Sequence, residues 1–179
     1  MTDAARFEAF VREYQDMVFA TAVRLLGRPA DAEDVAQTVF LKAFQRFDEV
    51  GVSVAAAGWL KTVTTNACLN HLSRYRSRWR LFSEMPGREE TGGSYETTLA
   101  APGSHGTDLE KADDRARLER ALRALPEHQR VPLVLFHFED KSYQEIADLL
   151  RRSLAKVKTD IHRGREALRS QIEARHGSR

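Results

Sequence analysis

The hydrophobic residues recur at helical intervals in two blocks, which are separated by a segment without any such pattern. The first block covers residues 1 to about 80, and the pattern returns at Thr107. Residues 83–107 between them are rich in Gly, Ser, Thr and Pro, so they cannot bury enough apolar surface to offset their ordering entropy. We therefore expect an all-α chain with two small helical domains, residues 1–82 and 108–179, joined by a flexible acidic linker over residues 83–107.

Three helices are predicted in the first block. A wide apolar stripe from Phe7 to Leu25 ends at Gly27, a residue typical of helix C-termini. Pro29 suits the first position of the next helix, and acidic residues crowd that helix's opening turns, where the helix dipole favours negative charge. A connection of small residues, Asp48–Ala57, leads to a third helix that is predicted to start near Gly58.

Two surfaces of this block have more than one interpretation. The second helix is apolar on more than one side, so Phe40, Phe44 and Phe47 belong either to the core or to a contact with a partner. The third helix interleaves an aromatic residue with amides, hydroxyls and cations, a mixture that suits single-stranded DNA. An ordinary amphipathic helix with a polar surface remains the alternative for the third helix.

The segment Ser142–Arg165 predicts two helices around a very short turn. Ser142 and Glu145 form a capping box, and Ser153 can cap the second helix. The first helix has its predicted buried side at Ile146, Ala147, Leu149 and Leu150, and the second at Leu154, Val157, Ile161, Leu168 and Ile172. Cations fall mostly on the other faces. The pattern is that of a DNA-binding helix-turn-helix, and a solvated helical hairpin is the alternative.

Composition argues against an enzyme or a metalloprotein. Cys68 is the only cysteine, which excludes an internal disulfide and a cysteine-based metal cluster, and the six histidines are scattered. We expect no metal, no cofactor, no catalytic residues and no membrane insertion, because no apolar run approaches the ~20 residues of a membrane span. The start of the chain lacks the pattern of a signal peptide, so a cytoplasmic location is expected. The net charge is only +2, but basic clusters on both sides of the acidic linker suggest two contacts with a polyanion.

Four motifs, in order, resemble the extracytoplasmic-function sigma factors of bacterial RNA polymerase. They are P-A-D-A-E-D-V-A-Q-T-V-F-L-K-A-F, G-W-L-K-T-V-T-T-N-A-C-L-N-H-L-S-R, L-P-E-H-Q-R-V-P-L-V-L and S-Y-Q-E-I-A-D-L-L. The resemblance covers nearly the whole chain except the linker. It implies a first domain, region 2, that binds the clamp helices of the polymerase β′ subunit and opens the promoter at the −10 element. It also implies a second domain, region 4, that binds the β flap and reads the −35 element.

The resemblance implies three sets of site residues. Core polymerase binding falls on Asp31, Glu33, Asp34, Gln37 and Phe40. Binding of −10 DNA falls on Trp59, Lys61, Thr62, Asn66, Asn70, Arg74 and Arg76, with Asp48–Ala57 as the loop that captures a flipped base. Binding of −35 DNA falls on Tyr143, Gln144, Lys156, Lys158, Thr159, His162 and Arg163. Promoter DNA and the polymerase core are thus the expected partners, and an anti-sigma factor is a further candidate.

The second domain departs from the family pattern at three places. Arg151 stands where the family usually has Gly in the turn, so the turn must accept a strained non-glycine residue. Ala155-Lys156 replaces the usual Gly-Thr. Asp160 replaces a usual Arg, which predicts a negative charge near the DNA face unless Asp160 pairs with Arg163 one turn later.

Two other classes of protein fit parts of the pattern. A dimeric helix-turn-helix repressor or activator would bind duplex operators without polymerase. A helical adaptor that binds only proteins would show no salt-dependent DNA affinity. The four ordered motifs favour a sigma factor, a promoter-specificity subunit that is not itself an enzyme.

Overall fold

The computed structural model describes residues 3–83 and 107–174, with side chains described for residues 3–78 and 111–174. All regular secondary structure in these ranges is helical, which confirms the predicted all-α fold. The first four helices are α1 (Asp3–Leu26), α2 (Pro29–Gln45), α3 (Phe47–Val50) and α4 (Ala56–Ser83). The last four are α5 (Thr107–Ala124), α6 (Glu127–His137), α7 (Tyr143–Leu150) and α8 (Leu154–Ala174). The predicted linker lies outside the described residues, apart from its end residues Ser83 and Thr107, which are helical.

The turn between α1 and α2 follows the prediction. Gly27 has φ +73°, a left-handed conformation that glycine adopts without strain, and its N–H donates to the carbonyl oxygen of Val23 at 2.8 Å. Pro29 then opens α2, where its missing N–H costs nothing.

The connection after α2 is shorter than predicted. It contains the one-turn helix α3, and α4 begins at Ala56 rather than near Gly58. Ser53 Oγ accepts a hydrogen bond from the N–H of Ala55 at 3.1 Å, and the N–H of Trp59 donates to the Ala55 carbonyl at 3.0 Å. The alanines of this first turn carry no apolar periodicity, and the sequence pattern therefore placed the helix start too late.

The helix-turn-helix pair α7–α8 has the predicted local geometry. Ser142 Oγ accepts from the N–H of Glu145 at 3.2 Å, while the Glu145 carboxylate accepts from the N–H of Ser142 at 2.7 Å. This second bond is the main reason that the pKa of Glu145 lies below its usual value. Ser153 caps α8 through the N–H of Lys156 at 3.2 Å. Arg151 adopts the left-handed conformation, with φ 52° and ψ 48°, so the turn does accept a strained non-glycine residue.

Helix α6 is the centre of the C-terminal half. Its consecutive residues Val131–Leu135 are all buried, and α8 approaches it so closely that a Cβ on Gly164 would lie 3.2 Å from the side chain of Leu133. Ile146, Val157 and Ile161 complete this core as predicted. Two predicted core residues are wrong: Leu149 and Leu154 are exposed, because they lie on the outer sides of α7 and α8.

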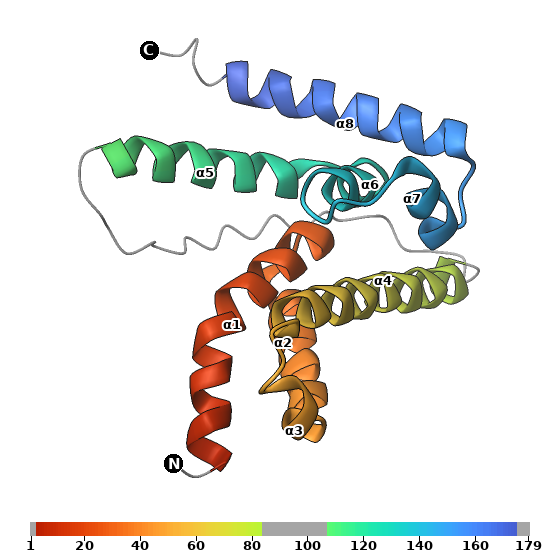
Figure 1. Cartoon of the computed structure of the whole chain (residues 1–179). Coiled ribbons are helices and arrows are strands. Elements are labelled where there is room, and N and C mark those ends of the chain that lie inside the picture. The colour runs from red at the N-terminus through yellow and green to blue at the C-terminus, as the bar shows by residue number, and fades with distance from the viewer. Residues whose placement is uncertain (1–2, 84–106, 175–179) are drawn as a thin grey trace.

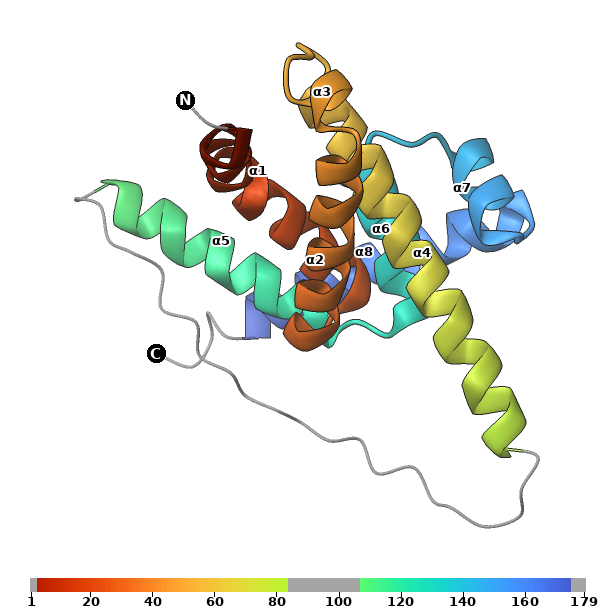
Figure 2. The same ribbon diagram turned by 90° about the horizontal axis from the view of Figure 1, so that it is seen from below.

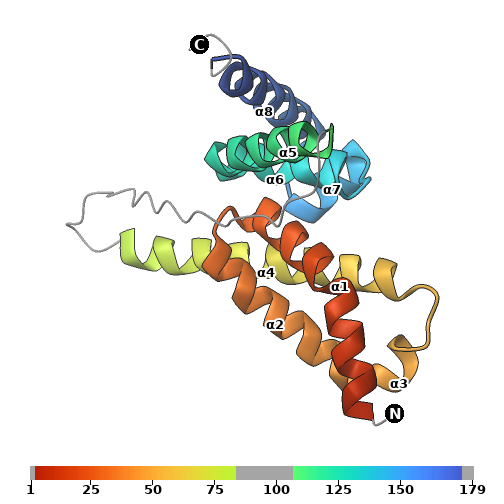
Figure 3. The ribbon, with the colours of Figure 1, turned by 90° about the vertical axis from the view of Figure 1, so that its left-hand side faces the viewer.

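The two halves of the molecule pack against each other. Figure 1 shows α5, α6 and α8 stacked above the end of α1 and above α4, and Figure 3 shows the same two layers from the side. From below, α4 crosses beneath α6 (Figure 2). The buried residues of both halves, including Leu25 and Val39 from the first and Val134 and Ile161 from the second, belong to one continuous hydrophobic cluster.

Cys68 of α4 is buried in this cluster, so the reactivity of its thiol tests whether the cluster is tightly packed. Burial, with a smaller contribution from the charge of Glu139, raises the pKa of the thiol to about 12. Because only the thiolate is nucleophilic, we expect alkylation by iodoacetamide at pH 8 to be at least about a hundredfold slower in native than in urea-unfolded protein. Mass spectrometry over a urea series measures this, and fast labelling of protein with native circular dichroism would contradict the burial.

Candidate nucleic-acid interface

The outer face of α8 presents the predicted recognition residues together. Lys158, Thr159, His162 and Arg163 are all exposed, whereas Val157 and Ile161 between them face the core. The Thr159 hydroxyl donates to the carbonyl of Ala155 at 3.0 Å, so it is oriented by its own helix. The first half of α8 therefore has a polar and cationic face suited to a DNA groove.

Tyr143 and Gln144 lie at the start of α7, beside this face. The Tyr143 ring stacks on Phe136 with centroids 4.7 Å apart, and Lys158 Nζ lies 5.9 Å from the Tyr143 ring centroid. Gln144 is exposed and donates to the Asp148 carboxylate at 3.1 Å. The packing on Phe136 fixes Tyr143 so that its ring contacts a cation of α8, Lys158.

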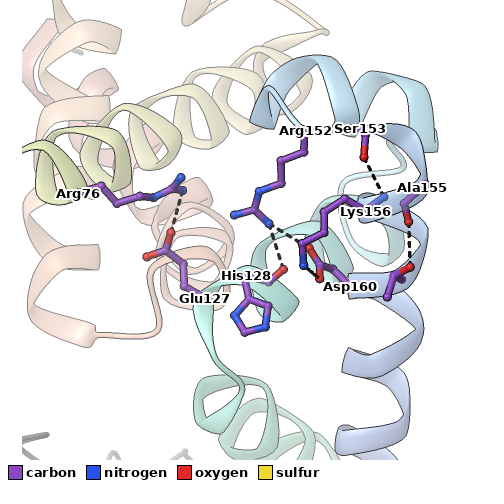
Figure 4. Close-up of polar contacts among 9 residues, drawn as sticks. Arg76, Glu127, His128, Arg152, Ser153, Ala155, Lys156 and Asp160 are labelled. Atoms are coloured by element: carbon purple, nitrogen blue, oxygen red, sulfur yellow. Dashed lines mark hydrogen bonds and ion pairs between the residues drawn. The ribbon is translucent and has the colours of Figure 1, made fainter. Parts of the chain in front are cut away.

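Asp160 does not lie on the outer face of α8, so the predicted negative charge on that face is wrong. Its side chain is 0% exposed and pairs with Lys156 and, at 3.3 Å, with Arg152 (Figure 4). Arg152 also donates to the His128 carbonyl at 3.3 Å. No pair with Arg163 is formed among these contacts, because residue 160 lies on the inner side of α8. Asp160 and Arg152 thus tie the turn, α8 and the start of α6 together.

The predicted −10 residues on α4 divide into three groups. Those that lie exposed at four-residue steps along one face are Thr62, Asn66, Asn70 and Arg74, hereafter the α4 stripe. Lys61 and Arg76 instead contact the C-terminal half: Lys61 Nζ donates to the Phe138 carbonyl at 3.1 Å, and Arg76 Nη2 lies 2.8 Å from Glu127 Oε1. Trp59 is half-buried against the core, so it is not an open stacking platform.

The predicted polymerase residues lie mostly on the outer face of α2. Glu33, Asp34 and Gln37 are exposed and Phe40 is half-buried. Asp31 is drawn away from them, because it pairs with Arg28 and with His71 Nε2, each at 3.7 Å.

Two large apolar residues extend the face of α2 that carries Asp34 and Gln37. Leu41 is 60% exposed and Phe44 is 57% exposed. The rings of Phe44 and Phe7 nevertheless pack in a T-shaped arrangement, with their centroids 4.9 Å apart. Sequence reasoning left Phe44 undecided and missed Leu41, which lies one helical turn after Gln37 and could have been found from that spacing. The loop before α4 also exposes Val52 and Val54.

Among the described residues, no group of three or more His, Cys, Asp or Glu side chains could hold a metal ion. In that same part of the chain, none of the helices has the length and apolar character needed to cross a bilayer.

Both halves of the chain match known protein families. The model of Sigma-70 region 2 matches residues 10–78, and that of Sigma-70 region 4 matches residues 115–168. The RNA polymerase sigma-E factor of Streptomyces coelicolor is 31% identical over 179 residues, covering 98% of this chain and 90% of that protein. The ECF RNA polymerase sigma factor SigW of Bacillus subtilis is 29% identical over 171 residues, covering 95% and 90%. The chain belongs to the extracytoplasmic-function sigma factors.

A solved structure shows the same fold. The sigma factor RpoE of Bartonella quintana, crystallised with the anti-sigma factor NepR, matches with a TM-score of 0.54 at 24% identity, over 93% of this chain and 96% of that one. Sigma factors are non-enzymatic initiation factors that bind RNA polymerase and promoter DNA. This sigma factor therefore acts in transcription initiation, and the alternatives of a polymerase-independent operator binder and of an adaptor are not supported.

The buried position of Asp160 predicts how this sigma factor responds to substitution there. Asp160→Arg places a third cation beside Arg152 and Lys156 without a counter-charge, so we expect a loss of about 3–5 kcal/mol of unfolding free energy. Thr159→Arg adds the same side chain at the exposed neighbouring position and should change stability by less than about 0.5 kcal/mol. Urea denaturation of both variants measures the difference, and equal stability would show that Asp160 does not tie the turn together.

Proposed function

We propose that this sigma factor binds the β′ clamp helices of core polymerase through the outer face of α2, opens the −10 element with α4, and reads the −35 element with α8. The proposal assigns region 2 to residues 1–82 and region 4, which would also contact the β flap, to residues 108–179. The observation that carries it is the α4 stripe, since amides and a cation in one exposed row form a track for single-stranded DNA.

The α2 face has the composition of a protein interface. Carboxylates at Glu33 and Asp34 lie beside the exposed apolar side chains of Leu41 and Phe44. Apolar anchors with a charged rim are typical of specific contacts, and an acidic rim suits a basic partner. Asp31 contributes less to this surface, because its carboxylate faces Arg28 and His71.

Reversing the charge of Asp34 tests this surface. Because Asp34→Arg would set like charges against a basic partner, we expect the Kd for core polymerase to rise at least about tenfold. Asp16→Arg makes the same change on the exposed side of α1 and should leave the Kd within about twofold. Titration of fluorescent sigma factor with purified core enzyme gives both values, and equal affinities would remove α2 from the interface.

The α4 stripe and the loop before α4 lie next to each other along the chain. Melting a promoter by binding requires a place for an extruded base, whose unstacking costs a few kcal/mol. The loop offers the exposed side chains of Val52 and Val54 as apolar contacts for such a base, and Asn66 and Asn70 offer amide donors and acceptors to its neighbours.

Substitution of the two asparagines separates melting from general binding. Asn66→Ala with Asn70→Ala should reduce open-complex formation on duplex promoters by about tenfold or more. The loss should be much smaller on promoters mismatched across −10, which have already met the unstacking cost. Gln15→Ala, an exposed amide on α1, is the control. Permanganate footprinting with core polymerase measures opening, and equal losses on both templates would assign the asparagines to another role.

The outer face of α8 supports the −35 assignment. Lys158 and Arg163 lie five residues apart on the exposed side, so both can enter one groove. Lys156 is exposed but is held partly by Asp160, so we assign it a phosphate contact rather than the reading of bases.

We also infer that the protein works in the cytoplasm and has no catalytic activity of its own. An anti-sigma factor is a candidate partner, by analogy with the RpoE–NepR complex.

A further inference from the structure

We propose that His137 is a positioning residue for the −35 contact, and that Arg165, which it holds, binds a phosphate at the edge of the DNA groove. His137 ends α6, outside the helix-turn-helix, and neither residue belongs to the predicted site residues. The imidazole orients the Arg165 guanidinium without neutralising it, so the full positive charge remains for DNA. The inference rests on the proposed function of α8 in binding −35 DNA.

Arg165 lies on the same side of α8 as part of the proposed recognition surface. It follows Lys158 by seven residues and His162 by three, so the three side chains share one exposed row along the helix. Seven residues span about 10.5 Å of helix, and the major groove is about 12 Å wide. When the first half of α8 lies in the groove, Arg165 can therefore reach the phosphates at the groove edge.

Two contacts hold the Arg165 side chain in place. Its Nε donates to His137 Nε2 at 3.0 Å, and its guanidinium carbon lies 5.4 Å from the centroid of the Phe136 ring. Phe136 stacks in turn on Tyr143, whose ring contacts Lys158. Each ring of this aromatic pair thus contacts one cation of α8. A side chain that is already fixed loses less conformational entropy when it binds a phosphate.

The groups that hold Arg165 carry no charge. A histidine accepts at Nε2 only when its ring is neutral and carries its proton on Nδ1. Burial, with a smaller contribution from the charge of Arg165, lowers the pKa of His137 and so favours the neutral ring at pH 7 and above. Among the described residues, no carboxylate pairs with Arg165, whereas Asp160 offsets the charge of Lys156. The charge of Arg165 is therefore available to an anion from outside the protein.

The outer nitrogens of Arg165 remain available as donors. Among the hydrogen bonds of the described residues, its guanidinium uses Nε alone, which leaves the four N–H groups of Nη1 and Nη2. Two of these can donate to two oxygens of one phosphate at once. Phosphate contacts position a protein on DNA without reading the sequence. Arg165 should therefore contribute to affinity and its salt dependence, and not to sequence preference.

A set of variants separates the role of His137 from that of Arg165. Arg165→Ala removes the cation, His137→Ala removes the group that holds it, and His137→Gln restores an uncharged acceptor in the amide oxygen. His128→Ala, at an exposed histidine near the start of α6, and Arg12→Ala, at an exposed arginine of α1, are the matched controls. Urea denaturation of each full-length variant checks that stability is retained.

Fluorescence anisotropy at pH 8 then measures binding of the full chain to a fluorescein-labelled duplex of mixed sequence over a series of KCl concentrations. We expect Arg165→Ala to weaken binding at least about fivefold at the lowest salt and to reduce the salt slope by about one, as the loss of one phosphate contact does. His137→Ala should weaken binding at least about threefold in the wild type, but less than about 1.5-fold on the Arg165→Ala background. His137→Gln and both controls should stay within about twofold of the wild type.

Three results would overturn the inference. They are an unchanged salt slope in Arg165→Ala, a loss from His137→Ala that is equal with and without Arg165, and a loss in His137→Gln as large as that in His137→Ala. Lys158→Ala with Arg163→Ala identifies which idea has failed. If neither this pair nor Arg165→Ala weakens duplex binding, the proposed function of α8 is wrong. If the pair weakens it but Arg165→Ala does not, only the role of His137 and Arg165 is wrong.

Discussion

The arrangement of the two halves depends on one buried cation. Arg130 leaves water to bond three backbone carbonyls, two of which end α1, more than a hundred residues earlier in the chain. Burial lowers the pKa of this guanidinium, which shows that the site disfavours its charge, while the nearby Glu127 opposes that effect. Such a group is retained only where its hydrogen bonds are well formed, because an unpaired buried charge costs several kcal/mol. Since Arg130 lies in α6, its bonds to the end of α1 also position the helices that pack on α6.

Among the described residues, carboxylates of the protein pair with several cations that lie near the proposed DNA-binding surfaces. Arg152 and Lys156 are held by Asp160, Lys61 by Glu139, and Arg76 by Glu127. Lys158 and Arg163, on the outer face of α8, are exposed. The net charge is only +2, but the charges are distributed unevenly over the surface. Association with a polyanion depends more on this distribution than on the net charge. Asp160 acts structurally, because its buried carboxylate pairs with Arg152 and Lys156.

Local signals in the sequence predicted local structure well. The capping box at Ser142 and Glu145, the glycine after α1 and the strained Arg151 all depend on residues within one or two turns. Asp160 was predicted wrongly because its residue type in the family pattern was given more weight than its spacing. It lies three residues after Val157 and one before Ile161, both buried, which places it on the inner side. The start of α4 was missed because alanines give no periodic signal.

The contact between the halves could not be predicted from the sequence. Arg130 binds backbone carbonyls, which every residue possesses, so no pattern of side chains marks its partners. The same holds for Lys61, whose closest acceptor is the carbonyl of Phe138. The residues predicted to bind −10 DNA do lie on one helix, α4. Their division into an exposed stripe and residues that contact the C-terminal half follows from packing between segments far apart in the chain.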